Sequence, residues 1–141
     1  MSKAAIVYWS ATGNTEAMAE AVLEGARTAG VDAALITAGD FDATQMDDYD
    51  AVAFGCPAMG AEVLEEDEFE PMFTGCEGKL AGKHIGLFGS YGWGDGQWMR
   101  DWQQRCIDDG AALVAEPVMA NEDPDDDAIA ACKALGVALG A

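Results

Sequence analysis

Basic residues are scarce in this chain. Its 141 residues include seven Lys and Arg, one His and 26 Asp and Glu, which gives a formal net charge of −19 at pH 7. A surface of this sign repels nucleic acids and anionic membrane surfaces, and it attracts basic proteins over long distances. We therefore expect no nucleic-acid or membrane partner, and we expect basic surfaces on partner proteins.

Paired cysteines, metal-ligand patterns and long apolar runs are also missing. The four cysteines (Cys56, Cys76, Cys106 and Cys132) show no C-x-x-C spacing, and with one His they match neither a zinc site nor a redox dithiol. No apolar run approaches the ~18 residues of a membrane span or has the form of a signal peptide. We expect a cytoplasmic monomer with reduced core thiols and no metal site.

The apolar segments predict a single α/β domain over residues 1–141. Strands are expected at 4–8, 32–36, 51–55 and 85–89, and a fifth at 111–114 that resumes at 118–120 beyond Pro117. Helices are expected from Glu16 to near Gly30 and at 68–76, 97–107 and 127–139. Buried strands separated by helices imply a doubly wound, five-stranded parallel sheet in a three-layer α/β/α arrangement. Ligands of such sheets bind beyond the carboxyl ends of the strands.

The segment after the first strand predicts a phosphate-binding loop. Residues 9–15 read WSATGNT and carry three hydroxyls, on Ser10, Thr12 and Thr15, just before a helix. Backbone N–H groups and the helix dipole favour a phosphate there. No Lys or Arg lies between Lys3 and Arg27, and the nucleotide-triphosphate motif GxxxxGK[ST] and the dinucleotide motif GxGxxG are both absent. The loop therefore suits one terminal phosphate monoester. The same residues also suit a simple helix N-cap.

The segments after the third and fourth strands predict a pocket for a planar heterocycle. Residues 89–96 contain four glycines with Tyr91 and Trp93 between them. This composition leaves backbone amides open to a ligand and offers flat faces for stacking. In the other segment, residues 55–62, the thioether of Met59 is suited to the opposite face of such a ring.

Together the three loops resemble those of short-chain flavodoxins from anaerobes, and the similarity continues through residues 62–71 and 98–101. The resemblance implies sheet order 2-1-3-4-5, one non-covalently bound FMN, and low-potential one-electron transfer instead of enzymatic turnover. FMN is expected rather than FAD, because nothing beyond the phosphate loop would hold an adenylate. The expected cofactor-binding residues are Trp9, Ser10, Ala11, Thr12, Gly13, Asn14, Thr15, Pro57, Ala58, Met59, Gly60, Ala61, Glu62, Ser90, Tyr91, Gly92, Trp93, Gly94 and Asp95. Ala11 departs from the family's usual Gly, and its Cβ would be unfavourable if this position required positive φ.

The resemblance further implies a redox-linked movement at Gly60. One-electron reduction with proton uptake turns the flavin N5 from an acceptor into a hydrogen-bond donor, and in flavodoxin-like proteins the carbonyl of the Gly in a Met-Gly turn flips to accept this bond. Glycine reaches the required positive φ at little cost. Ala61 has no polar side chain, so the switch would use the backbone alone. Glu62 is implied to accept the flavin N3–H.

Residues 55–62 and 89–96, the segments expected to hold the ring, are called the ring loops below. Carboxylates around them predict a low second reduction potential. One carboxylate about 8 Å from an anionic ring costs roughly 2 kcal/mol at an effective dielectric of ~20, which corresponds to about 90 mV. Seven carboxylates flank these loops: Glu62, Glu65, Glu66, Asp67, Glu68, Glu70 and Asp95. The expected working cycle therefore runs between semiquinone and hydroquinone, with the chain shuttling electrons between redox enzymes.

Other functions remain as alternatives. A response-regulator receiver shares this topology but needs acidic residues after the first strand, where this chain has Trp9 and Ser10. An FMN-dependent quinone or nitro reductase would need a substrate pocket and usually a dimer, for which the short chain has little material. A flavin-free regulatory module is a third alternative. Trp98, Met99 and Trp102 fall at helical spacing and are expected in the core.

Overall fold

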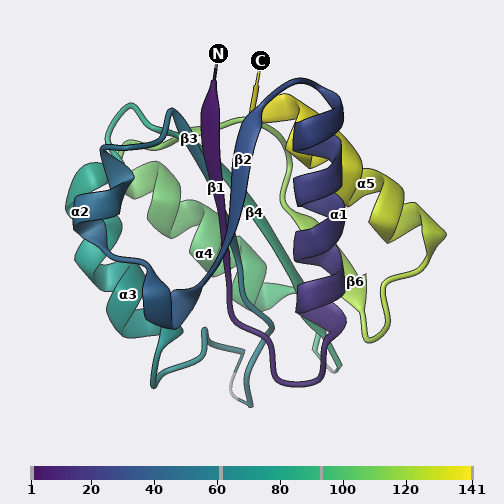
Figure 1. Cartoon of the computed structure of the whole chain (residues 1–141). Helices are drawn as coiled ribbons and strands as arrows, with labels where there is room; N and C mark the ends of the chain where they lie inside the picture. The colour runs from purple at the N-terminus through teal and green to yellow at the C-terminus, as the bar shows by residue number, and fades with distance from the viewer. Residues whose placement is uncertain (1, 61, 93, 141) are drawn as a thin grey trace.

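Strands and helices alternate along the chain in the computed structural model, which describes residues 2–60, 62–92 and 94–140 (Figure 1). The strands are β1 (Lys3–Tyr8), β2 (Asp32–Thr37), β3 (Ala51–Gly55), β4 (His84–Tyr91), β5 (Ala112–Leu113) and β6 (Val118–Asn121). The α-helices are α1 (Asn14–Thr28), α2 (Ala43–Met46), α3 (Phe69–Cys76), α4 (Gln97–Asp108) and α5 (Asp126–Ala138), with 3₁₀ turns η1 (Ala38–Asp40) and η2 (Glu77–Lys79).

All strand pairs of the sheet are parallel, and the order β2-β1-β3-β4-β5 confirms the predicted 2-1-3-4-5 arrangement. The fifth position is divided between two short strands. β5 pairs with the start of β4 and β6 pairs with its end, from Phe88↔Val118 to Tyr91↔Asn121. Pro117, between them, has no N–H to donate to a strand ladder, which agrees with the interruption expected there.

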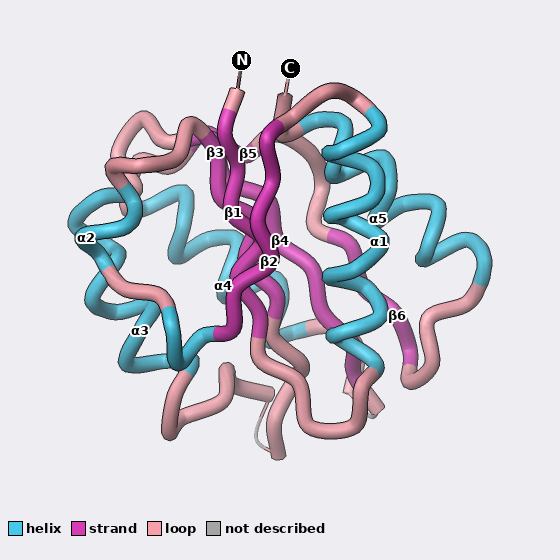
Figure 2. The backbone as a smooth tube through the Cα atoms, viewed as in Figure 1, coloured by secondary structure: helices cyan, strands magenta, loops and turns pink. Residues whose placement is uncertain are grey.

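Helices cover both faces of the sheet. α1 and α5 lie on one face, and α2, α3 and α4 lie on the other (Figures 1 and 2). Because side chains alternate along a strand, Val52 and Phe54 join the core under α3 and α4, whereas Ala51 and Ala53 join the core under α1 and α5. The central strands β1, β3 and β4 are buried on both sides, as the three-layer prediction required.

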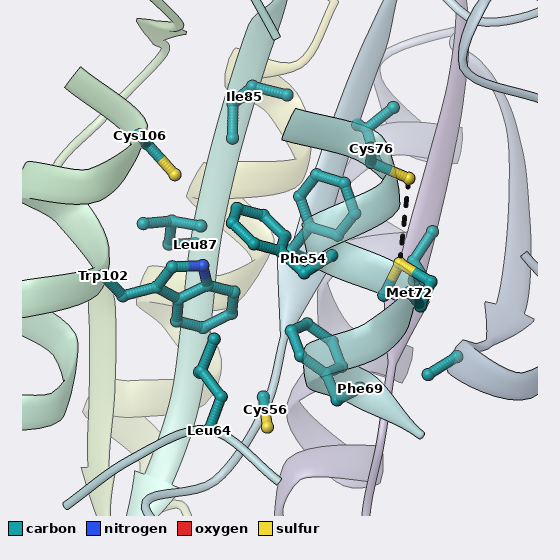
Figure 3. Packing of buried hydrophobic residues seen from close by; sticks show 14 of the residues in the cluster. Phe54, Cys56, Leu64, Phe69, Met72, Cys76, Ile85, Leu87, Trp102 and Cys106 are labelled. Atoms are coloured by element: carbon teal, nitrogen blue, oxygen red, sulfur yellow. Dashed lines mark hydrogen bonds between the residues drawn. The ribbon is translucent and has the colours of Figure 1, made fainter. Parts of the chain in front are cut away.

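An aromatic cluster fixes α3 and α4 on the sheet (Figure 3). The ring of Phe54 lies edge-on to Phe73, with centroids 5.1 Å apart, and Phe69 lies edge-on to Trp102 at 5.4 Å. Such edge-to-face pairs are favourable beyond the area that they bury. Trp98, Met99 and Trp102 are buried, so their expected place in the core is confirmed.

The backbones of α1 and α5 approach each other without intervening side chains. A Cβ on Gly25 would meet the carbonyl oxygen of Lys133 at 2.0 Å, and one on Gly136 would meet that of Val22 at 2.1 Å. At its C-terminal end α1 stops as predicted, since Gly30 has φ +85° and Val31 N–H donates to the Ala26 carbonyl.

Two local predictions were wrong. The short helix α2 was not expected; it begins with a capping box in which Asp42 accepts from Thr44 N–H and Gln45 accepts from Asp42 N–H. β4 is longer than expected, and it includes Ser90 and Tyr91, which were assigned to a loop. Both residues pair with β6, and this pairing extends the strand.

Candidate cofactor site

The connections that follow β1, β3 and β4 gather at the edge of the sheet opposite the chain termini (Figure 1). Parts of all three line one cavity of about 270 Å³, together with the residue after β6. The lining residues are Ser10, Ala11, Thr12, Asn14, Thr15, Pro57, Ala58, Met59, Ser90, Tyr91, Gly92 and Glu122. Eleven of these twelve residues were predicted from the sequence.

The loop between β1 and α1 is shaped by Ser10 and Gly13. Gly13 has φ +95°, and its N–H donates to Ser10 Oγ at 3.1 Å. Glu16 N–H donates to the same oxygen at 3.3 Å. Among the described non-glycine residues positive φ occurs at Glu62 and Glu122, so Ala11 keeps an ordinary backbone conformation and its Cβ is tolerated.

The start of α1 presents backbone N–H groups to the cavity. Within the described residues, no intramolecular acceptor is assigned to the N–H groups of Thr12, Asn14 and Thr15. No Lys or Arg is found among the residues that line the cavity. Open amides at the positive end of a helix dipole suit an anionic group, and here they would neutralise it without a cationic side chain.

Thr15 and Ser90 are directed at each other and not simply at the loop. Their hydroxyl oxygens lie 2.9 Å apart, and Ser90 N–H donates to Thr15 Oγ1 at 3.4 Å. Both residues are buried, with 1% and 6% of their surface exposed. The pair ties the first turn of α1 to the end of β4. Of the three hydroxyls expected at one spot, that of Thr15 contacts Ser90, that of Ser10 accepts from the loop, and Thr12 is exposed.

The loop after β3 forms a short, closed turn. Ala58 N–H donates to the Ser90 carbonyl at 3.0 Å, and Met59 N–H donates to the Val63 carbonyl at 2.9 Å. Gly60 lies at the tip of this turn, and among the described residues other than its chain neighbours no atom lies within 4 Å of the position that a Cβ would take there. Ala61, the next predicted residue, lies outside the described part of the chain.

Glu62 joins this turn to the loop after β4. It has φ 54°, and its Oε1 accepts the Gln97 N–H, at the first residue of α4, at 3.1 Å. Gly94 has φ +87°, and a Cβ at this position would lie 2.6 Å from Glu62 Oε1. The two ring loops are thus in direct contact beside the cavity. Trp93 lies outside the described residues.

Trp9 and Asp95 lie outside this cavity. Trp9 lines a neighbouring hollow of about 400 Å³, and its Nε1 donates to Glu68 Oε1 at 3.4 Å. Asp95 is exposed and forms an ion pair with Arg100 at 2.9 Å. A larger cavity of about 660 Å³, between β6 and α5, contains none of the predicted site residues.

Sequence reasoning missed Glu122. It follows β6, has φ 59°, and donates its N–H to the Tyr91 carbonyl at 2.7 Å. Its place directly after a strand at the carboxyl edge of the sheet was the available signal, but the divided fifth strand concealed it.

Neither a metal site nor a membrane span is found in the described part of the chain. No group of three or more His, Cys, Asp or Glu side chains is arranged to hold a metal ion there. None of the helices described is both long and apolar enough to cross a bilayer.

Comparison with known proteins identifies the family. The model of the flavodoxin family matches residues 6–136. The chain belongs to the flavodoxin family. It is 47% identical to a flavodoxin of Megasphaera elsdenii over 133 residues, which cover 94% of this chain and 95% of the relative. It is 46% identical to a flavodoxin of Clostridium beijerinckii over 121 residues, 86% of this chain and 88% of the relative.

Solved flavodoxin structures have the same fold. The solution structure of two-electron reduced M. elsdenii flavodoxin superposes with a TM-score of 0.89 at 46% identity, covering 96% of this chain and 97% of that chain. A flavodoxin from the domain Archaea gives a TM-score of 0.85 at 28% identity, covering 97% and 95%. The resemblance to short-chain flavodoxins of anaerobes is confirmed. As a flavodoxin, the chain is an electron-transfer flavoprotein and not an enzyme.

Proposed function

We propose that this flavodoxin is a low-potential one-electron carrier that binds FMN non-covalently and cycles between semiquinone and hydroquinone, passing electrons between redox enzymes of the cytoplasm. The proposal rests on one observation above all, the unpartnered N–H groups of Thr12, Asn14 and Thr15 at one end of a cavity walled by the ring loops. When bound, FMN supplies a ring that accepts electrons one at a time.

The phosphate of FMN fits the start of α1. The loop amides and the helix dipole would neutralise it, and the exposed hydroxyl of Thr12 would add a further donor. Ser10 holds the loop in shape from within, through its bonds to Gly13 and Glu16. Because no cation takes part, we expect the phosphate to contribute affinity through directional hydrogen bonds.

The ring fits between the loops after β3 and β4. Met59 and Ala58 supply one wall of the cavity, and Tyr91 and Gly92 supply another. Trp93 and Ala61 are assigned to the site on sequence alone. The assigned bond of Glu62 to Gln97 uses Oε1, so acceptance of the flavin N3–H by the other carboxylate oxygen remains our proposal.

Gly60 is the proposed hinge of the redox response. The bonds Met59 N–H to Val63 O and Glu62 N–H to Met59 O, of 2.9 and 2.7 Å, hold the turn on both sides of it. Its φ lies outside the left-handed range in this structure, and the space around it is open. A change to positive φ is therefore sterically available, and only glycine makes that change at low cost.

Fewer carboxylates would repel charge on the ring than the sequence suggested. Glu70 is paired with Arg105, Asp95 with Arg100, and Glu65 with three backbone amides. Glu66 and Asp67 remain, as do Glu62 and Glu68, which accept one N–H bond each, and Glu122 joins these four. The net charge of −19 still favours partners with basic surfaces, and we propose that the carrier works as a monomer.

Titration of the purified chain with FMN and with riboflavin tests the proposal. FMN should bind at least about 100-fold more tightly, since several charge-assisted hydrogen bonds are lost with riboflavin. Potentiometry should then resolve two separate one-electron steps. With NAD(P)H as the donor, the holoprotein should turn over only when a partner reductase is added. Equal affinity for the two flavins, or a single two-electron step, would contradict the proposal.

A further inference from the structure

Glu65 differs from the acidic residues around it. It is 5% exposed, whereas its neighbours Glu66, Asp67 and Glu68 are exposed. Burying a carboxylate is costly unless hydrogen bonds replace its water. The environment of Glu65 must therefore supply those bonds.

Three backbone N–H groups meet the Glu65 carboxylate. Oε2 accepts from Asp67 at 2.7 Å, and Oε1 accepts from Glu68 and Phe69 at 2.8 Å each. These amides lead into α3, whose N-cap residue Glu68 makes no capping bond with its own side chain. Burial raises the pKa of Glu65, but the three N–H bonds outweigh it and hold the pKa below its usual range. Glu65 is therefore a charged anchor at the start of α3.

The backbone of Glu65 closes the base of the preceding loop. Its N–H donates to Cys56 Sγ at 3.4 Å, and Cys56 directly follows β3. Residues 57–64, which carry Gly60 and Glu62, thus leave and rejoin the protein at one fixed point. Bonds from Ala58 to Ser90 and from Met59 to Val63 shape the loop above this base.

We propose that Glu65 is a positioning residue for the flavin, which sets the geometry of the loop that carries Gly60 instead of acting on the ring by its charge. The inference rests on the proposed function. Its physical basis is that the two ends of the loop are held by one residue, so loosening that residue changes the relative free energies of the two orientations of the Gly60 peptide. The dipoles of three amides offset part of the field of the Glu65 charge and hold the carboxylate in one position.

Three variants of the full-length holoprotein separate position from charge. Glu65→Gln removes the charge of the side chain. It also replaces one of the two accepting oxygens by an NH₂ group, which cannot accept from a backbone N–H. Glu66→Gln removes the same charge one residue away, at an exposed position with no assigned hydrogen bond of its side chain. Glu65→Asp keeps the charge but is one methylene too short for the same contacts. The readouts are the FMN dissociation constant, the two midpoint potentials, and hydrogen exchange of the Asp67, Glu68 and Phe69 amides in the protein without FMN.

We expect Glu65→Gln and Glu65→Asp to weaken FMN binding about tenfold and to change the equilibrium constant of the first reduction by a similar factor. The second reduction should change far less, and exchange at the three amides should accelerate. Glu66→Gln should leave FMN binding and exchange unchanged. Equal shifts of both potentials in Glu65→Gln and Glu66→Gln, with Glu65→Asp like the wild type, would overturn the inference and assign Glu65 a purely electrostatic role.

If Glu65→Gln does not fold, Cys56→Ala provides the test, because it removes the Sγ that accepts the Glu65 N–H, together with the long contact of that Sγ with the Pro57 carbonyl, and leaves the Glu65 carboxylate unchanged. It should shift the first reduction and not the second, and no shift would overturn the inference. Failure of the wild type to bind FMN would instead refute the proposed function. In that case the exchange data would still decide whether Glu65 anchors the loop.

Discussion

Thr15 Oγ1 and Ser90 Oγ lie 2.9 Å apart in the buried junction between the first turn of α1 and the end of β4. This contact connects the proposed phosphate loop to a strand 75 residues away in the sequence. The two hydroxyls can satisfy each other, so the junction is stable without a ligand and holds the phosphate loop in place before one binds.

Thr15→Val should lower both stability and FMN affinity. Valine has the shape of threonine but leaves the Ser90 hydroxyl and N–H without their partner, which costs about 1–3 kcal/mol. Urea unfolding and FMN titration measure the two effects. Thr12→Val, at an exposed position, is the matched control and should weaken FMN binding with unchanged stability. A Thr15→Val protein as stable as the wild type would contradict the structural role.

Arg105→Lys should destabilise the fold by about 1–2 kcal/mol, because lysine cannot reproduce a planar bidentate contact. Arg105 binds both oxygens of Glu70 at 2.8 and 2.7 Å and also binds Glu77 at 2.7 Å. It joins α4 to the first turn of α3, through Glu70, and to η2, through Glu77. Arg100→Lys is the control, since the Arg100–Asp95 pair is largely exposed and its loss should cost less than about 0.5 kcal/mol. Similar losses in both variants would refute this difference.

Asp109→Asn should stabilise the protein at neutral pH. A hydrogen bond with Glu77 and burial raise the pKa of Asp109 to about 6, above its ordinary value of 3.8. The folded state therefore holds a proton that the unfolded state has lost, and stability falls as the pH rises through this interval. The variant should gain under about 1 kcal/mol at pH 7 to 8, since Asp109 is only half-buried and solvent screens part of the interaction.

Below about pH 4 the gain in stability from Asp109→Asn should disappear, because the Asp109 carboxyl is then protonated in both the folded and the unfolded protein. Thermal unfolding between pH 4 and 8 measures this dependence. A gain in stability for Asp109→Asn that is the same at every pH between 4 and 8 would exclude a protonated Asp109 that is hydrogen-bonded to Glu77.

The four thiols should resist alkylation in the folded protein. All four cysteines are free and buried, as predicted. Burial raises the pKa to about 12 for Cys56, Cys106 and Cys132 and to about 11 for Cys76, so almost no thiolate exists at pH 8. Iodoacetamide followed by mass spectrometry should detect labelling only after urea is added. Fast labelling of Cys56 in the native state would show that the base of the loop opens.

Much of this architecture could be predicted from local patterns. The five apolar segments and Gly30 mark strands and a helix end by rules that act over a few residues, and the structure agrees with them. The short α2 was missed because a four-residue helix has no periodicity to detect and depends on the capping box of Asp42.

The partners of individual site residues could not be predicted. That Ser90 belongs to β4 depends on pairing with β6, which is 30 residues away in the sequence. Likewise the acidic run at 62–70 gives no sign that Glu65 is buried while Glu66 is exposed, because this difference arises only when α3 docks on the sheet.

The division of the fifth sheet position leaves an interval, residues 115–117, that is free of the strand ladders on either side. Additional residues inserted there would alter neither the pairing of β5 with the start of β4 nor that of β6 with its end. The protein could therefore acquire an extra surface segment in this interval while Asn121 and Glu122 kept their places. New contacts with other proteins could evolve at that border independently of the residues that surround the cavity.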